Sequence, residues 1–152
     1  MTYATKRPSP TRVDVVVLDS RWLEAVPDVE RIVRKAARTA AGRGKVSLTV
    51  ALADDRRVQL LNARDRRKNK PTNVLSYPSG ERVFLGDIVL ARQTVLREAR
   101  QQKKTPRAHV SHLVVHGTLH LLGYDHEENG EAERMEALER RILARMGIAD
   151  PY

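Results

Sequence analysis

Two histidines four residues apart, followed closely by a third, are the residues of this sequence best suited to metal chemistry. On a helix, the side chains of His116 and His120 point to one face with Cα atoms about 6 Å apart, so both can reach one ion at about 2.1 Å. Gly123 can end that helix by adopting a positive φ, and the turn can bring back His126 as a third ligand. Three imidazoles beside an open fourth position are typical of a catalytic zinc site. We therefore predict one zinc ion per chain, at a site that other divalent transition metals could also occupy.

The same histidine spacing occurs in metalloproteases, whose H-E-x-x-H signature carries the general base on its glutamate. In this chain Gly117 stands at the glutamate position, although Gly123 matches the glycine of the elongated protease signature. The spacing therefore favours a metal site, whereas the missing base argues against a peptidase. Without the third histidine, His116 and His120 would more often be two residues on the polar face of an amphipathic helix than metal ligands.

Two further histidines and one aspartate are candidates for acid–base or supporting roles. His109 and His112 continue the stripe of His116 along the helix, but His109 lies about 10 Å from His116, too far to share its ion. Both either support the site and face the substrate, or simply line a cleft. Asp125 precedes the third histidine and could orient a metal ligand through a hydrogen bond. His112 and Asp125 are the candidates for the general base, and the sequence does not decide between them.

Positive charge is concentrated in the first two thirds of the chain. The net charge is +9, and residues 1–110 hold 24 basic and 11 acidic side chains, against 4 and 8 in residues 111–152. A basic surface near a metal site favours a polyanionic partner such as RNA, although a basic composition can also serve solubility. Only four per cent of the residues are aromatic, so stacking platforms for bases are scarce. We therefore do not expect sequence-specific recognition by this domain alone.

The elements that must position these residues follow from hydrophobic patterning within a chain whose length, 152 residues, suits a single domain. Strands are expected at 13–19, 45–53, 73–78 and 82–91. Helices are expected at 28–42, from Asp54 or Asp55 onward, at 92–102, from Thr105 and Pro106 through the histidines, and at 129–146. Residues 1–12 are polar, contain two prolines and are expected to form a loosely ordered leader. About four strands and five helices result.

The expected location of the protein in the cell follows from the targeting and membrane-spanning segments that the sequence lacks. A membrane-spanning helix needs about eighteen consecutive apolar residues, and a signal peptide needs an apolar core near its start. Neither pattern occurs, so we expect no membrane association and a cytoplasmic location. The absence of cysteine excludes disulfides and cysteine-ligated zinc.

Several segments of the chain occur in a combination typical of one bacterial family. They are HGTLHLLGYDH, LN…R…KPTNVLSYP, LGDI and the closing GIADPY. Together they resemble the YbeY-type ribosomal RNA maturation endoribonucleases, from about residue 45 onward. The resemblance implies an α+β domain with a small mixed sheet and one metal ion held by three histidines. It also implies cleavage of single-stranded RNA in small-subunit ribosomal RNA 3′-end maturation and ribosome quality control, with the small ribosomal subunit or its associated proteins as partners.

Carried over residue by residue, the resemblance places the metal ligands at His116, His120 and His126 and a family arginine at Arg66. Zinc held by imidazoles can lower the pKa of its water to about 7 and polarise a phosphoryl oxygen, and a planar guanidinium matches two phosphate oxygens. We therefore expect a zinc-dependent endoribonuclease in which Arg66 stabilises phosphate charge. The neighbouring basic residues expected to hold RNA are Arg64, Arg67, Lys68 and Lys70.

Other readings of the same residues stay open. Arg66 could belong to a merely solvated basic loop, and Asp65 beside it stands where the family usually has an aromatic residue. Asn69 and Tyr77 also depart from the family pattern, which has Asp and Phe there. The protein could instead be a metal-containing ribosome-assembly factor without catalysis, or a metal-dependent hydrolase of another substrate class.

Overall fold

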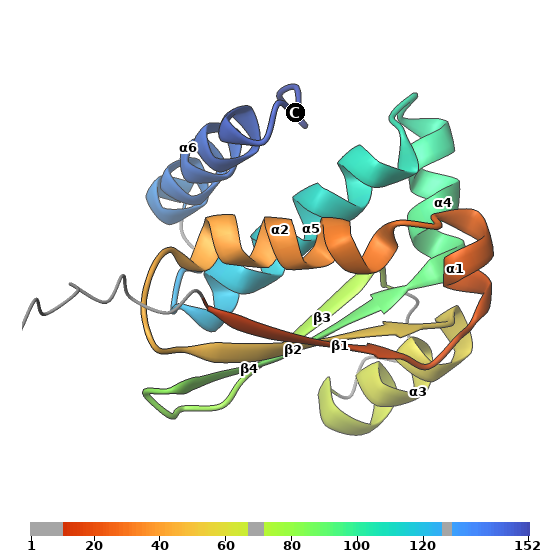
Figure 1. Cartoon of the computed structure of the whole chain (residues 1–152), viewed down its shortest axis with the longest axis horizontal. Coiled ribbons are helices and arrows are strands. Elements are labelled where there is room, and N and C mark those ends of the chain that lie inside the picture. Colours follow the sequence, from red (N-terminus) through yellow and green to blue (C-terminus); the bar gives the residue numbers. More distant parts are fainter. Residues whose placement is uncertain (1–10, 67–71, 126–128) are drawn as a thin grey trace, which may run out of the picture.

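The apolar alternation at Leu48, Val50 and Leu52 forms an inner strand of a four-stranded sheet, and all three side chains are buried. The computed structural model describes residues 11–66, 72–125 and 129–152, and Figure 1 shows how their helices and strands are arranged. In chain order the elements are β1 (Arg12–Val17), α1 (Arg21–Ala25), α2 (Val29–Ala41), β2 (Ser47–Ala53), α3 (Asp55–Arg66), β3 (Val74–Pro78), β4 (Phe84–Ala91), α4 (Arg92–Gln101), α5 (Pro106–Leu121) and α6 (Asn129–Arg145).

The sheet is mixed, with strand order β1-β2-β4-β3. Strands β1, β2 and β4 are parallel to one another, whereas β3 pairs antiparallel with β4 along the edge. Parallel neighbours need a crossover connection, which α1 and α2 provide between β1 and β2. The expected α+β fold with a small mixed sheet of about four strands is therefore confirmed.

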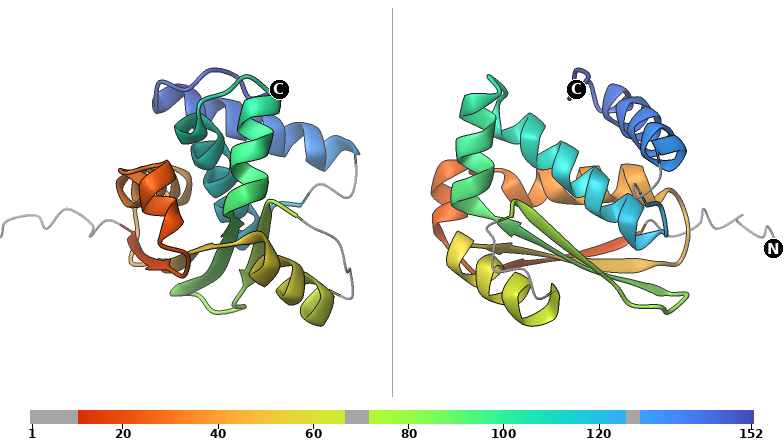
Figure 2. Two further views of the ribbon diagram at one scale, coloured as in Figure 1. Left: turned by 90° about the vertical axis from the view of Figure 1, so that its right-hand side faces the viewer. Right: turned by 180° about the vertical axis from the view of Figure 1, so that it is seen from behind.

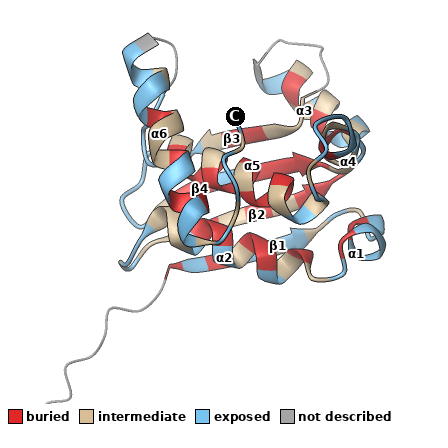
Figure 3. Cartoon of the chain, turned by 90° about the horizontal axis from the view of Figure 1, so that it is seen from above, coloured by how far each residue is buried: buried red, intermediate tan, exposed pale blue. Residues whose placement is uncertain are grey.

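Helices cover both faces of the sheet, and most of them lie on one face. Helices α2 and α5 lie side by side there with α6 against α5, whereas α3 covers the opposite face (Figure 2). The larger hydrophobic cluster includes residues of the sheet, α2, α5 and α6, and a smaller one lies under α3. Figure 3 shows that much of α5 is buried while α6 exposes its outer side. Helix α5, which carries the histidines, is thus the central helix of the fold.

A sixth helix, α1, was not predicted. It spans five residues and is anchored by Trp22, whose side chain is fully buried and whose indole Nε1 donates to the Ala53 carbonyl at 2.8 Å. A helix of little more than one turn is too short to produce a recognisable 3.6-residue hydrophobic period. Its position is decided by the tertiary contact of one tryptophan.

Two residues of the segment predicted as a loose leader, Thr11 and Arg12, belong to the folded domain. Strand β1 begins at Arg12, and Thr11 is buried with its hydroxyl donating to the Gly42 carbonyl at 3.0 Å. The prediction of a loose leader over 1–12 is therefore wrong for Thr11 and Arg12, because pairing with β2 and this side-chain bond hold them in place. Residues 1–10 lie outside the described part of the chain. Among the described residues, no helix is both long enough and apolar enough to cross a membrane.

Candidate metal centre

Local chemistry defines both ends of α5. Thr105 caps its start, accepting a hydrogen bond from the Ala108 amide at 3.1 Å, and Pro106 occupies the first helical position. After the helix, Gly123 adopts a φ of 101°, and the Tyr124 amide donates to the Leu119 carbonyl at 3.0 Å. The predicted start and the predicted glycine turn are both confirmed. The turn reverses the chain directly after the histidine pair.

Gly117 lies where α5 presses most closely on the sheet. A Cβ atom at this position would stand 3.1 Å from both Ser76 Oγ and Ile88 Cδ1. The residue at the protease glutamate position therefore faces strands β3 and β4 and is buried. A side chain at this position would press on Ser76 and Ile88, so position 117 is ill suited to the peptidase base.

The imidazoles of His116 and His120 face each other through their Nε2 atoms, which are 3.0 Å apart. Their opposite nitrogens are both engaged: His116 Nδ1 donates to Glu139 Oε1 at 2.5 Å, and His120 Nδ1 donates to the Tyr124 carbonyl at 2.9 Å. A carbonyl oxygen can only accept, and an ionised carboxylate likewise, so the proton of each ring sits on Nδ1. In the neutral form of either ring, the Nε2 atom then presents a lone pair toward the other ring.

This arrangement fits a bound cation. Two lone pairs at this separation repel each other unless a positive charge lies between them. Two nitrogen ligands at about 2.1 Å from a tetrahedral zinc ion lie about 3.4 Å apart, close to the distance between the two Nε2 atoms. His116 and His120 thus have the donor type, protonation and orientation that zinc or another nitrogen-preferring divalent metal requires.

Behind His116 lies Glu139, a carboxylate that sequence reasoning missed. Its side chain is fully buried, and its Oε2 accepts a hydrogen bond from the Tyr152 hydroxyl. Burial would raise the pKa of Glu139, but hydrogen bonds from His112, His116 and Tyr152 outweigh it and lower the pKa to about 2. Burial and the bond to Glu139 raise the pKa of the Tyr152 phenol. One signal could have revealed Glu139: it falls at helical spacing between Met135 and Ile142, inside the apolar stripe of α6.

The two other histidines of α5 have different environments. His109 is buried, and its Nε2 lies 2.9 Å from Glu98 Oε1 on α4, away from the metal pair. Burial lowers the pKa of this imidazole below its usual value, although Glu98 acts in the opposite direction. His112 instead joins the Glu139 group, with its Nε2 3.3 Å from the Tyr152 hydroxyl and 3.8 Å from Glu139 Oε2. His109 therefore supports the fold, and His112 adjoins the metal centre.

Comparison with known proteins shows the family of this chain. The family model described as Endoribonuclease YbeY matches residues 18–147. The chain belongs to the YbeY endoribonuclease family. It is 49% identical to the Endoribonuclease YbeY of Azorhizobium caulinodans over 92% of this chain and 95% of that protein. It is 48% identical to that of Gluconobacter oxydans, over 91% and 86% respectively. A solved relative in fold is TM1509 from Thermotoga maritima, at 24% identity and a TM-score of 0.54 over 93% of this chain and 97% of that one.

The structure brings together part of the predicted YbeY-type site. His112, His116 and His120 form one group, and Asp125 follows the turn at an exposed position. His126, Arg67, Lys68 and Lys70, together with Asn69 and the side chain of Arg66, lie outside the described residues. Their predicted roles stay predictions.

Of the four basic residues predicted to hold RNA, Arg64 is the one that lies within the described residues. It pairs with Asp65 in a two-point contact of 2.6 and 3.0 Å, which raises the pKa of its guanidinium. Asp65 thus binds a neighbouring guanidinium on an exposed part of α3. Arg64 can contact phosphate only by sharing or leaving this partner.

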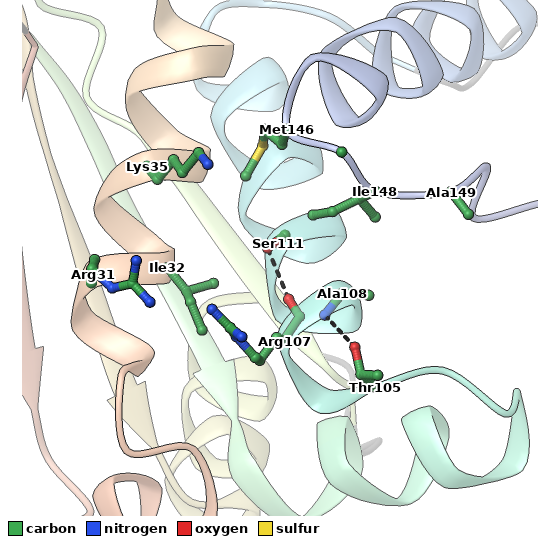
Figure 4. Close-up of a pocket in the computed structure, with 11 residues that line it drawn as sticks. Arg31, Ile32, Lys35, Thr105, Arg107, Ala108, Ser111, Met146, Ile148 and Ala149 are labelled. Carbon is green, nitrogen blue, oxygen red and sulfur yellow. Dashed lines mark hydrogen bonds between the residues drawn. The ribbon is translucent and has the colours of Figure 1, made fainter.

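A basic hollow, which the sequence did not predict, adjoins the first half of α5. The cavity has a volume of about 430 Å³ and lies between α2, α5 and the chain after α6 (Figure 4). Arg31, Lys35 and Arg107 lie around it, and Ile32, Met146 and Ile148 supply apolar lining. Asp28 holds Arg31 at 2.7 Å and Arg107 at 2.9 Å, which leaves net positive charge at the hollow.

Proposed function

We propose that this chain is a metal-dependent endoribonuclease that cleaves single-stranded RNA. The ion is zinc, one per chain, with His116, His120 and His126 as ligands. The observation that carries the proposal is the pair of facing Nε2 atoms, each oriented by an acceptor behind its ring. Membership of the YbeY family supports an endoribonuclease activity.

The protein's own groups prepare the site for phosphodiester hydrolysis. A divalent ion bound there supplies a water of lowered pKa and a Lewis acid for the phosphoryl oxygen. Glu139 and the Tyr124 carbonyl hold the two imidazoles in the protonation state that binds metal. His112, beside Glu139 and partly accessible, is the nearest described candidate to exchange a proton with the reacting groups. Asp125, exposed after the turn, is a second candidate.

Charge on the phosphate requires a cation, and we assign this role to Arg66. Arg66 is the last residue of α3. Helices α3 and α5 contact the edge strand β3 from opposite faces of the sheet. In this proposal the Arg66 side chain reaches the phosphate around that edge. Its planar guanidinium suits two phosphate oxygens at once. Arg64, Arg67, Lys68 and Lys70 are proposed to hold the RNA beyond it.

The basic hollow suits the same polyanionic substrate. Arg31, Lys35 and Arg107 can neutralise phosphates, and the apolar lining can contact a base (Figure 4). Both the hollow and the histidine pair involve α5, and in this proposal one strand of RNA contacts both. The natural substrate that we infer from the family is small-subunit ribosomal RNA near its 3′ end, processed in the cytoplasm with the small subunit as partner.

The test is cleavage of defined polymers by metal-defined protein. We expect zinc-loaded protein to cut an internally labelled single-stranded RNA, to cut duplex RNA poorly and to leave a peptide intact. Chelated protein and His116→Ala should be inactive, whereas Leu122→Ala, an exposed change on the turn beside the site, should keep activity.

Purifying His116→Ala in parallel controls for contaminating ribonuclease. Equal cleavage by wild type and His116→Ala would refute the nuclease function. If wild type then binds RNA and metal without cutting, the protein is an assembly factor.

A further inference from the structure

Glu139 is a charged residue placed where α6 otherwise buries apolar side chains. Met135, Ile142 and Leu143 around it on the helix are buried, and Glu139 itself has no exposed surface. Removing a carboxylate from water is strongly unfavourable unless hydrogen bonds replace the lost hydration. Burial alone would favour an apolar side chain at this position. The presence of a carboxylate is therefore accounted for by its hydrogen-bond partners.

Its partners are unusual for a buried acid. Among the described residues, both carboxylate oxygens are bound by the imidazole of His116 and the Tyr152 hydroxyl, with His112 nearby, and by no lysine or arginine. The carboxylate therefore bonds directly to the ring of a proposed metal ligand, on the nitrogen opposite the metal-facing Nε2.

The segment that delivers Tyr152 is held from several sides. Lys104 Nζ donates to the Pro151 backbone carbonyl at 2.7 Å, and the Arg140 side chain pairs with that of Asp150, with Nε 3.1 Å from Oδ2. The Tyr152 ring stacks edge-on against His112, with centroids 5.3 Å apart. These contacts place the phenol oxygen on Glu139 Oε2. The position of the carboxylate therefore depends on residues from α5, α6 and the segments that follow α4 and α6.

We propose that Glu139 is a positioning residue for the metal centre, and that Tyr152 holds it in place. The carboxylate keeps the His116 proton on Nδ1, turns Nε2 toward the ion and strengthens the imidazole as a ligand. In metal sites, removing such a hydrogen-bonded carboxylate typically lowers metal affinity by about 10–100-fold. His120 has a neutral carbonyl in the same role, so charge is supplied to one ligand of the pair. The inference rests on the proposed metal function.

The test measures zinc affinity by competition with a chromophoric chelator, without any activity assay. Glu139→Gln keeps the shape and one accepting oxygen but loses the charge, and it should weaken zinc binding by about 10–100-fold. Tyr152→Phe keeps the ring on His112 and removes the hydroxyl, and a smaller loss of a few-fold is expected. Glu133→Gln, on the same helix but exposed, is the matched control and should bind as wild type does.

A second readout reports the proton directly. Long-range ¹H–¹⁵N correlation spectra of metal-free protein should show His116 protonated on Nδ1 in wild type, and a mixture of the two tautomers in Glu139→Gln. If Glu139→Gln unfolds, Tyr152→Phe carries the same test on the same two measurements.

The outcomes separate the two proposals. A wild type that binds no zinc would overturn the metal centre itself. A wild type that binds zinc, with Glu139→Gln and Tyr152→Phe unchanged in both affinity and tautomer, would overturn the role of Glu139 alone.

Discussion

Replacing Gly117 by alanine should show how tightly α5 packs against the sheet at the position of the protease glutamate. The added Cβ would stand 3.1 Å from Ile88 Cδ1, 3.1 Å from Ser76 Oγ and 3.2 Å from Ile88 Cγ1. Such overpacking destabilises proteins by about 1–3 kcal/mol. Alanine is also favoured over glycine inside a helix by about 1 kcal/mol. The net change expected for Gly117→Ala is therefore a loss of roughly 0–2 kcal/mol in the free energy of unfolding.

A matched variant separates the packing effect from helix propensity. Gly130 lies near the start of α6, and nothing stands within 4 Å of a Cβ built there. Gly130→Ala should stabilise the fold by up to about 1 kcal/mol, so the two variants should differ by roughly 1–3 kcal/mol. Urea denaturation followed by circular dichroism measures both. If Gly117→Ala stabilises as much as Gly130→Ala does, α5 is not in tight contact with the sheet.

Ile88→Val provides an internal check, because it removes the Cδ1 atom that the new methyl group would meet. In that background the Gly117→Ala loss should shrink, with a coupling energy of at least about 0.5 kcal/mol. Additive effects would contradict the contact. Gly117→Glu should fold poorly and gain no peptidase activity, because its carboxylate would be buried against β3 and β4.

Two further predictions concern charged residues away from the histidines. Asp19 and Arg92 form a largely buried pair at 2.6 Å; burial would raise the pKa of Asp19, but hydrogen bonds from Arg92 and Arg21 lower it below its usual value. Because the folded pKa lies below the unfolded one, this pair stabilises the fold above about pH 4, and the contribution disappears as the pH falls through the folded pKa. In urea denaturation, Asp19→Asn should lower the free energy of unfolding by about 1–3 kcal/mol at neutral pH. In acid, the variant and wild type should be equally stable, and a difference of the same size at both pH values would refute the assignment. At the basic hollow, Lys35→Ala or Arg107→Ala in the His116→Ala background should reduce the log–log slope of single-stranded RNA affinity against salt by about 0.7 each; unchanged slopes would exclude these residues from RNA binding.

What the sequence predicted well depended on local chemistry. Thr105 and Pro106 start α5, and Gly123 ends its turn, because capping and positive φ involve only neighbouring residues. The stripe of His116 and His120 followed from helical spacing alone. The alternation in β2 likewise needed no tertiary knowledge.

What the sequence did not reveal depended on contacts between distant segments. Glu139 bonds to His116 across 23 residues of sequence, and only the folded chain brings the two side chains together. Tyr152 reaches His112 across 40 residues. Trp22 forms its helix through a bond to Ala53, and the basic hollow needs three separate elements to come together. The hydrophobic periodicity of a single segment does not predict contacts between segments that are distant in the sequence.

The central claim is that RNA cleavage depends on a metal at the paired histidines. Titrating zinc into metal-free protein tests this claim most directly. The quantity measured is the initial rate of cleavage of a single-stranded RNA at each zinc occupancy. We predict that the rate rises in proportion to bound zinc, reaches a plateau at one equivalent per chain, and stays at background throughout for His120→Ala. A rate that is the same with and without zinc, or the same in wild type and His120→Ala, would contradict the metal centre as the site of cleavage.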